Sequence, residues 1–331
     1  MITLGGVDYP SVYCATGARG FYGEGYPFHR YWRFLGMNWK GTGFSGKTLT
    51  LLPRRGSKHT GPDGKSEKGN MELESDGVTP VEMFPKCIYV NFASGEIINA
   101  VGLSNFGMEF YLSSGMYHRL EKPFFISVAL DAVGDSEQEA EIIAICDLLK
   151  RFMPFKAPFA LQVNYGCPNS GHDLSSFYNT MANQVGLFKS LLEVPVFVNT
   201  NALMPLLVLK EVSMIADGLW IGNTIPWRAP ETINKIDWDA RGNVSPLRLR
   251  GIEVDGGLSS HSCLQFTLDL VAGLRDSGVS IPIIAGNGIR TVEDVRMLKR
   301  VGADGMFICS LAVVRPWSMK KVISCGNDVF R

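Results

Sequence analysis

The stretch IPIIAGNGIRTVEDVRMLKRVGADGMFICS, residues 281–310, contains the repeating unit that decides the fold. The apolar runs IPIIAGN (281–287) and ADGMFICS (303–310) flank TVEDVRMLKRVG (291–302), in which apolar residues recur at helical spacing. Apolar runs of this kind are typical of buried parallel strands, which need a crossover helix between them. The stretch therefore predicts a strand–helix–strand unit.

The same alternation extends over most of the chain. Further candidate strands lie at 11–15, 46–52, 123–130, 158–164, 194–199 and 216–223, and further candidate helices at 136–153, 175–193, 201–215 and 262–278. Eight strands are the number that closes a barrel, and 331 residues suffice for one, although a doubly wound sheet is the alternative. We predict an α/β fold: a single (β/α)8 TIM barrel spanning 1–331.

One segment, from Arg54 to Gly95, breaks this rhythm. Its first part, RRGSKHTGPDGKSEKGNMELESDG (54–77), is polar and rich in glycine, so we do not expect it to carry a core. Loops of this length in compact domains are usually lids, oligomer contacts or disordered segments. We predict a long inserted loop after the second strand, over 57–95.

The composition limits the kinds of partner. Lysine plus arginine and aspartate plus glutamate both number 32, which gives no net charge to favour nucleic acid or an anionic membrane. The seven cysteines form no CxxC pair and their number is odd, which argues against a disulfide framework and a zinc site. No leader-like start or membrane-spanning apolar run is present. We expect a cytoplasmic protein with a small-molecule partner and no metal.

Polar residues gather where the predicted strands end, which is where barrel enzymes place their chemistry. Asparagine recurs there, and the segment INAVGLSNFG (98–107) adds two more. One such asparagine is often only a turn or a helix cap. Several converging carboxamides suit a flat ligand edged with C=O and N–H groups, such as a pyrimidine or a flavin. The asparagines are Asn99, Asn105, Asn164, Asn169, Asn199, Asn223 and Asn287.

Ordered blocks along the chain carry a resemblance to a known family. The blocks include KTLTLLPRRG (47–56), INAVGLSNFG (98–107), VNYGCPNSG (163–171), PIIAGNGIRTVEDV (282–295) and GADGMFIC (302–309). With them the chain resembles the FMN-dependent dihydroorotate dehydrogenases in their class 1 form, and more distantly dihydropyrimidine dehydrogenase. The resemblance implies an FMN cofactor, a pyrimidine substrate and a homodimer, and it leaves an iron-sulfur partner subunit open.

The resemblance also implies roles for individual residues. It makes Cys167 the catalytic base and places Lys47 beside both flavin and substrate. The residues implied for the substrate are Asn99, Val101, Gly102, Leu103, Asn164, Asn169, Asn223 and Thr224. Those implied for FMN are Ala15, Thr16, Gly17, Lys47, Ser127, Asn164, Asn199, Gly256, Gly257, Gly286, Asn287, Gly288, Cys309 and Ser310. Glycine-rich turns among them offer backbone N–H groups to a phosphate.

The chemistry of the implied reaction assigns a task to Cys167. Oxidation of a dihydropyrimidine removes a hydride, which flavin N5 accepts, and a proton, which a side chain on the opposite face accepts. A thiolate can accept the proton if its loop excludes water, and the alternative is an inert loop thiol. A hydrolase-type pair with His172 and Asp173 would need an oxyanion site that the spacing does not show.

One departure from the family concerns the charge beside the flavin. Relatives carry a lysine where this chain has Asn199, and a neutral carboxamide cannot neutralise the negative charge of a reduced flavin. Smaller departures are Gly166 and the pair Cys309–Ser310. We expect an FMN oxidoreductase that oxidises dihydroorotate or a related dihydropyrimidine. The alternatives are an FMN-dependent reductase of another conjugated carbonyl compound and a flavin- or pyrimidine-binding protein without turnover.

Overall fold

Eight parallel strands form a barrel in the computed structural model, which describes residues 1–61, 64–166 and 181–331. A parallel bridge between Tyr13 and Gly43 joins the two edge strands of this sheet, so the predicted (β/α)8 TIM barrel is confirmed. In spatial order the strands are β3 (Val12–Cys14), β14 (Gly305–Ile308), β13 (Ile283–Ala285), β10 (Gly218–Asn223), β9 (Val196–Asn201), β8 (Phe159–Asn164), β7 (Phe124–Val128) and β4 (Phe44–Ser45).

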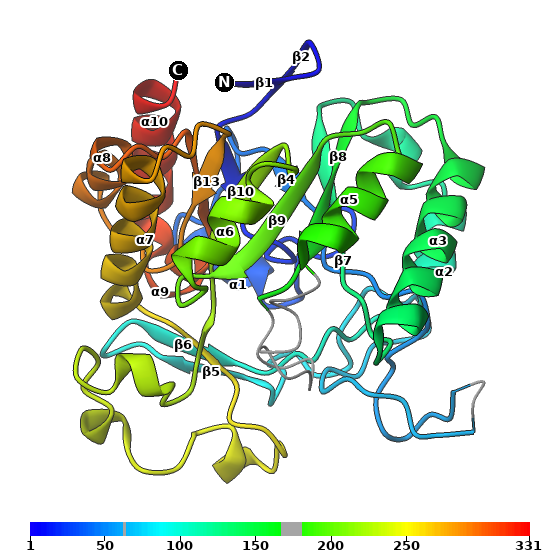
Figure 1. The fold of residues 1–331 in the computed structure, drawn as a ribbon. Coiled ribbons are helices and arrows are strands. Elements are labelled where there is room, and N and C mark those ends of the chain that lie inside the picture. The colour runs from blue at the N-terminus through cyan, green and yellow to red at the C-terminus, as the bar shows by residue number, and fades with distance from the viewer. Residues whose placement is uncertain (62–63, 167–180) are drawn as a thin grey trace.

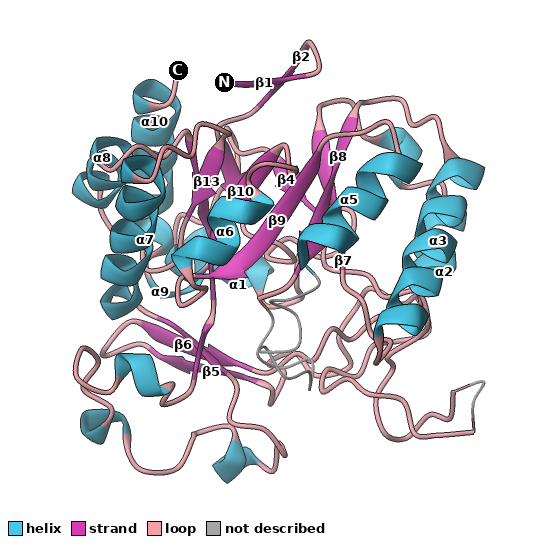
Figure 2. Cartoon of the chain, viewed as in Figure 1, coloured by secondary structure: helices cyan, strands magenta, loops and turns pink. Residues whose placement is uncertain are grey.

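Helices surround the barrel, as Figures 1 and 2 show. Those predicted at 136–153, 201–215, 262–278 and 291–302 are present with shifted ends, while part of the one predicted at 175–193 lies outside the described residues. The described α-helices are α1 (His29–Phe34), α2 (Met108–Ser113), α3 (Asp135–Phe152), α5 (Met181–Leu191), α6 (Leu206–Val212), α7 (Leu264–Asp276), α8 (Val292–Arg300), α9 (Ser310–Val314) and α10 (Met319–Val329).

The second barrel strand differs from its prediction. The strand expected at 46–52 is instead β4, Phe44–Ser45, and beyond it only Leu49 makes a bridge, to Val128. The reason is that the N–H of Lys47 donates to the carbonyl of Gly20, 2.9 Å away, rather than to a neighbouring strand. The pairing with β7 is therefore interrupted at Lys47 and resumes at Leu49, whose N–H donates to the Ser127 carbonyl at 2.9 Å.

A second, antiparallel sheet lies at the end of the barrel opposite the N-terminal hairpin (Figure 1). Its order is β11 (Ile225–Pro226), β12 (Gly257–Ser259), β6 (Glu96–Asn99) and β5 (Ile88–Asn91), and the hairpin comprises β1 (Ile2–Leu4) and β2 (Val7–Tyr9). The sequence did not predict this sheet. It brings Asn99 to the mouth of the barrel, because Asn99 pairs with Gly257.

The predicted inserted loop, 57–95, carries more structure than its composition suggested. It contains β5, and its side chains Met71, Leu73 and Cys87 are buried in the main core. The expectation that this segment carries no core was therefore wrong. These three apolar residues are spread thinly among polar ones, so their contribution depends on tertiary contacts that no periodic pattern announces.

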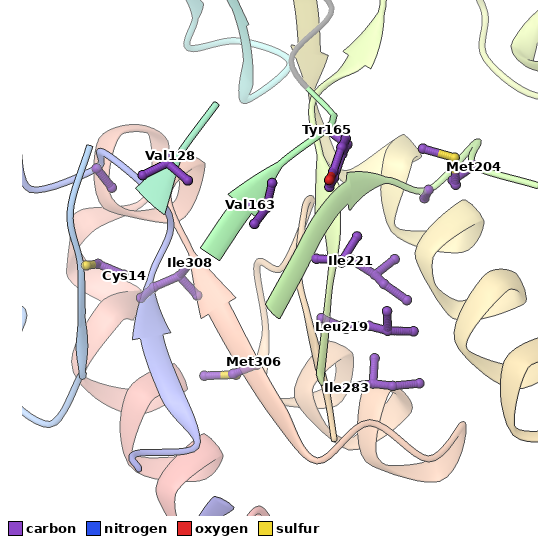
Figure 3. Close-up of a cluster of buried hydrophobic side chains, with 14 of the residues drawn as sticks. Cys14, Val128, Val163, Tyr165, Met204, Leu219, Ile221, Ile283, Met306 and Ile308 are labelled. Atoms are coloured by element: carbon purple, nitrogen blue, oxygen red, sulfur yellow. The ribbon is translucent and has the colours of Figure 1, made fainter. Parts of the chain in front are cut away.

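Alternate residues of each barrel strand face two different cores. Leu219 and Ile221 of β10 pack outward against the helices (Figure 3), whereas Trp220 packs inside the barrel with Phe125 and Phe197. Of the described helices, none is both long enough and apolar enough to cross a bilayer. In the described part of the chain the barrel interior is thus filled largely by aromatic rings.

Candidate active site

A cavity of about 220 Å³ lies at the carboxyl ends of the barrel strands. Its walls come from barrel strands β8, β9 and β10, from the turns after β3, β13 and β14, and from β6 and β12 of the second sheet. At its inner end the rings of Trp220 and Phe307 stack, with centroids 5.0 Å apart and planes 16° apart. The cavity is therefore closed below by aromatic rings and edged above by polar strand ends.

Most of the sequence-predicted site residues line this one cavity. They are Ala15, Thr16, Gly17, Lys47, Asn99, Val101, Gly102, Leu103, Asn164, Asn199, Asn223, Thr224, Asn287, Gly288, Cys309 and Ser310. Cys167 and Asn169, together with His172 and Asp173, lie outside the described residues. Residues far apart in the sequence therefore meet, as the strand-end argument predicted.

Four predicted residues do not line the cavity but lie behind its wall. Ser127 is buried, and its hydroxyl lies 3.0 Å from that of Thr48. Gly256 and Gly257 lie behind Asn99, and a Cβ on Gly256 would lie 2.6 Å from the carbonyl oxygen of Asn99. A Cβ on Gly286 would lie 2.4 Å from the Phe307 ring. These positions shape the wall rather than form its surface.

Asn164 is the centre of a carboxamide network. Its Nδ2 donates to Thr48 Oγ1 at 3.0 Å, and its Oδ1 accepts from Asn223 Nδ2 at 3.0 Å. Asn223 Oδ1 in turn accepts from the backbone N–H of Thr224 at 2.8 Å, and Asn287 Nδ2 donates to the Asn223 carbonyl at 3.3 Å. The amide planes along one wall are thereby fixed, which pre-orients donors and acceptors for a ligand.

Lys47, next in the chain to Thr48, supplies a positive charge to the cavity wall. The side chain is only 6% exposed, its ammonium donates to the carbonyl of Ser104, and Nζ lies 5.0 Å from the centroid of the Phe21 ring. Among the described residues that line the cavity, Lys47 is the only lysine or arginine, and none is aspartate or glutamate. The described wall therefore carries one positive charge.

Asn199 lies among neutral polar groups. It is 2% exposed, and its Nδ2 lies 3.4 Å from Oε1 of Gln162, which also accepts from the Thr16 hydroxyl at 2.7 Å. In the described part of the chain, Asn199 Oδ1 and Asn287 Oδ1 are buried without a hydrogen-bond partner. Buried polar atoms without partners are rare and indicate groups that a ligand or ordered water satisfies.

The segment 101–105 forms the cavity edge beside Lys47 and is held from behind by Arg54. Leu103 adopts a left-handed backbone with φ 59°, a strained conformation for a residue with a branched side chain. Arg54, 2% exposed, donates from Nε to the Gly102 carbonyl at 3.0 Å and forms an ion pair with Asp131. Its backbone also pairs with Asn105. Arg54 thus fixes the loop that carries Gly102 and Leu103.

Comparison with models of protein families identifies the family to which the chain belongs. The model described as "Dihydroorotate dehydrogenase" matches residues 56–325, most of the chain. The chain belongs to the dihydroorotate dehydrogenase family. Members of this family are oxidoreductases that act on CH–CH donors and are in general flavoproteins. The resemblance inferred from the sequence is confirmed.

Curated relatives of this dihydroorotate dehydrogenase family protein include bacterial proteins. The "Dihydroorotate dehydrogenase B (NAD(+)), catalytic subunit" of Listeria welshimeri is 28% identical over 240 residues, covering 70% of this chain and 71% of the relative. The protein of the same description from Bacillus caldolyticus is 27% identical, covering 70% and 69%.

Solved structures share the fold. The Eimeria tenella structure described as DHODH in complex with ferulenol has a TM-score of 0.63 and 19% identity, covering 98% of this chain and 82% of that one. The structure described as the ligand-free type from the same organism has a TM-score of 0.60 and 18% identity, covering 99% and 86%.

Sequence reasoning missed one wall of the cavity in this family member. Tyr26, Phe28, His29 and Trp39, from the segment that includes α1, line it. His29 is 7% exposed, and its Nδ1 accepts from the N–H of Tyr26 at 3.3 Å. Burial lowers the pKa of His29 to about 4, helped by nearby Arg33 and Arg19, so the ring is neutral at pH 7. Only the density of aromatic residues at 21–34 could have signalled this wall.

Cys309 is the described thiol that faces the cavity. It is exposed, but into the cavity, and the protein atoms packed around it raise the pKa of its thiol to about 12. It is therefore a neutral, weakly polar group at neutral pH. Among the residues that the structure describes, no cluster of histidine, cysteine, aspartate or glutamate could hold a metal ion.

Proposed function

We propose that the protein is an FMN-dependent oxidoreductase that oxidises dihydroorotate or a closely related dihydropyrimidine. The observation that carries this proposal is the shared cavity, which Lys47 lines together with the hydrogen-bonded carboxamides of Asn164 and Asn223. One cation and several donor–acceptor amides complement a planar, anionic ring edged with C=O and N–H groups. Kinship with dihydroorotate dehydrogenases supports the same ligand class.

The substrate would contact both Lys47 and the carboxamides. Asn99, Asn164 and Asn223 would bind the ring edges, and the fixed loop Val101–Leu103 would hold one end of it. Because Asn164 already forms hydrogen bonds with Thr48 and Asn223, its amide loses little orientational entropy when the substrate binds. Asn169 belongs to the same proposed set.

The described residues fit an FMN cofactor. The buried oxygens of Asn199 and Asn287 have no partner in the described chain, and the stacked rings of Trp220 and Phe307 close the inner end of the cavity. We assign the cofactor to the implied residues at Ala15–Gly17, Lys47, Asn164, Asn199, Asn287–Gly288 and Cys309–Ser310, with Ser127 and Gly256, Gly257 and Gly286 supporting them from behind. When bound, FMN supplies a hydride acceptor.

Cys167 would accept the proton that leaves the substrate. The Cys–His alternative is less favoured, because it needs a developed oxyanion site. Loss of Cys167 should separate binding from chemistry: Cys167→Ala should keep affinity for orotate while the rate of substrate oxidation falls by orders of magnitude. A residual rate near that of the wild type would exclude Cys167 as the base.

A second candidate function is supported by one observation, the neutral surroundings of Asn199. A cavity with one described cation suits a flavin- or pyrimidine-binding protein without turnover as well.

The relatives are named catalytic subunits, so a separate electron-accepting subunit, such as an iron-sulfur protein, is a further proposal. The expected homodimer stays a prediction that size-exclusion chromatography with light scattering would check.

The visible spectrum tests the proposed function directly. A purified protein with bound FMN should be yellow and should bleach when dihydroorotate is added without oxygen. A yellow protein that binds orotate but does not bleach would support the binding protein without turnover. Bleaching by NAD(P)H and reoxidation by an enone, but not by orotate, would support the reductase of other conjugated carbonyl compounds. A colourless protein that cannot take up FMN would refute the proposal.

A further inference from the structure

The described wall of the cavity carries less positive charge than the negative charge that the proposed reaction would produce in it. Its described wall carries Lys47 as its only lysine or arginine, and the ammonium of Lys47 is already engaged by the Ser104 carbonyl beside the Phe21 ring. Oxidation of dihydroorotate leaves an orotate anion in the cavity, and two electrons with one proton would leave a second negative charge on the flavin ring. One cation cannot balance both charges within the cavity.

Among the residues that the structure describes, the neighbours of Asn199 offer no second cation. Asn199 on β9 pairs with Asn164 on one side and Trp220 on the other, and its amide contacts Gln162. The ion pair attached to this strand, Lys189–Asp217, lies at its other end, where Asp217 accepts from the N–H of Val196. Strands β8, β9 and β10 therefore present only neutral groups to the cavity.

The other titratable groups of the described wall are neutral as well. His29 is uncharged because burial lowers its pKa to about 4. Cys309 stays protonated because burial raises its pKa to about 12, and burial also raises the pKa of Tyr26. Tyr165, directly after β8 but not among the residues that line the cavity, is buried and likewise has a raised pKa. At neutral pH none of these groups stabilises an added negative charge by Coulomb attraction.

We propose that this cavity holds the reduced cofactor in its neutral form, so that two protons accompany the two electrons that enter it. The balance is FMN + 2e⁻ + 2H⁺ → FMNH2, whereas a lysine at position 199 would favour FMN + 2e⁻ + H⁺ → FMNH⁻. Oxidation of dihydroorotate to orotate supplies both hydrogens, one as hydride and one as the proton given to Cys167, so no net proton would be released. The inference rests on the FMN of the proposed function.

Counting protons during reduction tests this inference without any substrate. The yellow holoprotein is reduced by light, a deazaflavin and a sacrificial amine donor, without oxygen, in a weak buffer at mildly alkaline pH with an indicator dye. Because oxidation of the donor itself releases protons, a parallel reduction of free FMN calibrates that release, which is subtracted. We expect two protons to be taken up per FMN by the wild type and by the matched neutral variant Asn199→Gln. We expect one proton for Asn199→Lys. The pH dependence of the midpoint potential should be twice as steep for the wild type as for Asn199→Lys.

The outcomes separate this inference from the proposed function. A yellow wild type that takes up one proton overturns the inference and leaves the oxidoreductase proposal standing. A protein that cannot bind FMN overturns both. If Asn199→Lys fails to fold, the wild type alone still tests the inference. Uptake of two protons per FMN, with the matching pH dependence of the midpoint potential, supports the inference, and uptake of one proton contradicts it.

Discussion

Asn223 donates a hydrogen bond from Nδ2 to Oδ1 of Asn164 across a distance of 3.0 Å. Because Nδ2 of Asn164 also donates to Thr48 at 3.0 Å, the orientation of both amides is determined by their partners. Two residues 59 positions apart, at the ends of strands β8 and β10, therefore form one polar surface, which we propose recognises the ligand. Changing the charge of this surface should alter ligand affinity more than stability.

Asn164→Asp places a negative charge on the cavity wall with almost no change of shape. We expect orotate to bind at least about tenfold more weakly, since a like charge a few ångströms away is worth about 1–4 kcal/mol in a protein environment. Titration of the flavin spectrum or calorimetry with orotate would measure this. The control is Asn183→Asp, the same change on the exposed face of α5, which should leave affinity unchanged. Unchanged affinity in Asn164→Asp would remove Asn164 from the ligand site.

Arg54 should matter for stability and for the cavity edge together. Arg54→Ala removes the buried partner of Asp131, whose ion pair with the exposed Lys68 remains. It also removes the donor to the Gly102 carbonyl, so we expect a loss of about 2–3 kcal/mol in the free energy of unfolding. The control is Arg151→Ala, which breaks an exposed pair with Glu109 and should change stability by less than about 1 kcal/mol. Urea unfolding of the two variants would compare them, and equal effects would contradict the role of Arg54.

The barrel and most of the cavity wall could be predicted from the sequence, because both depend on repetition. Apolar runs alternating with helical periodicity define the strands, and barrel geometry brings the residues after each strand to one face. Lys47, Asn164 and Asn223 meet for this reason alone. The family resemblance then supplied roles that the pattern could not supply.

Other parts of the structure could not be predicted because their strands are too short to carry a pattern. Strand β11 has two residues and β12 three, and each is defined by its partner in the second sheet rather than by its own sequence. The aromatic wall from Tyr26 to Trp39 has no simple periodicity, so its place beside the cavity depends on tertiary packing. The shift of β4 to Phe44–Ser45 likewise follows from the contact between Lys47 and Gly20.

Burial of His29 predicts a dependence of stability on pH. Its pKa in the folded protein is about 4, below its ordinary value of 6.5, so the unfolded chain binds the extra proton first as the pH falls. The stability contributed by neutral His29 is present above about pH 6.5 and is lost as the pH falls towards 4, by roughly 3 kcal/mol in total.

The variant His29→Gln isolates this contribution. We expect the wild type to lose more stability than His29→Gln between pH 7 and pH 4.5, because the glutamine does not titrate. Chemical unfolding at several pH values would give the two curves. Parallel curves for the two proteins would show that His29 is not the group responsible.

Gly222 should tolerate no side chain, because its backbone approaches that of Gly286. It adopts φ +121°, and a Cβ there would lie 2.3 Å from the Gly286 carbonyl oxygen. We expect Gly222→Ala to destabilise the protein by about 2 kcal/mol or more and to weaken FMN binding, because Asn223 follows directly. The matched control is Gly186→Ala in α5, where a Cβ meets nothing closer than 4.0 Å. That change should stabilise the protein by about 0.5–1 kcal/mol through helix propensity. Thermal unfolding of both variants would show opposite signs, and a stable, fully yellow Gly222→Ala protein would contradict the close approach of the two turns.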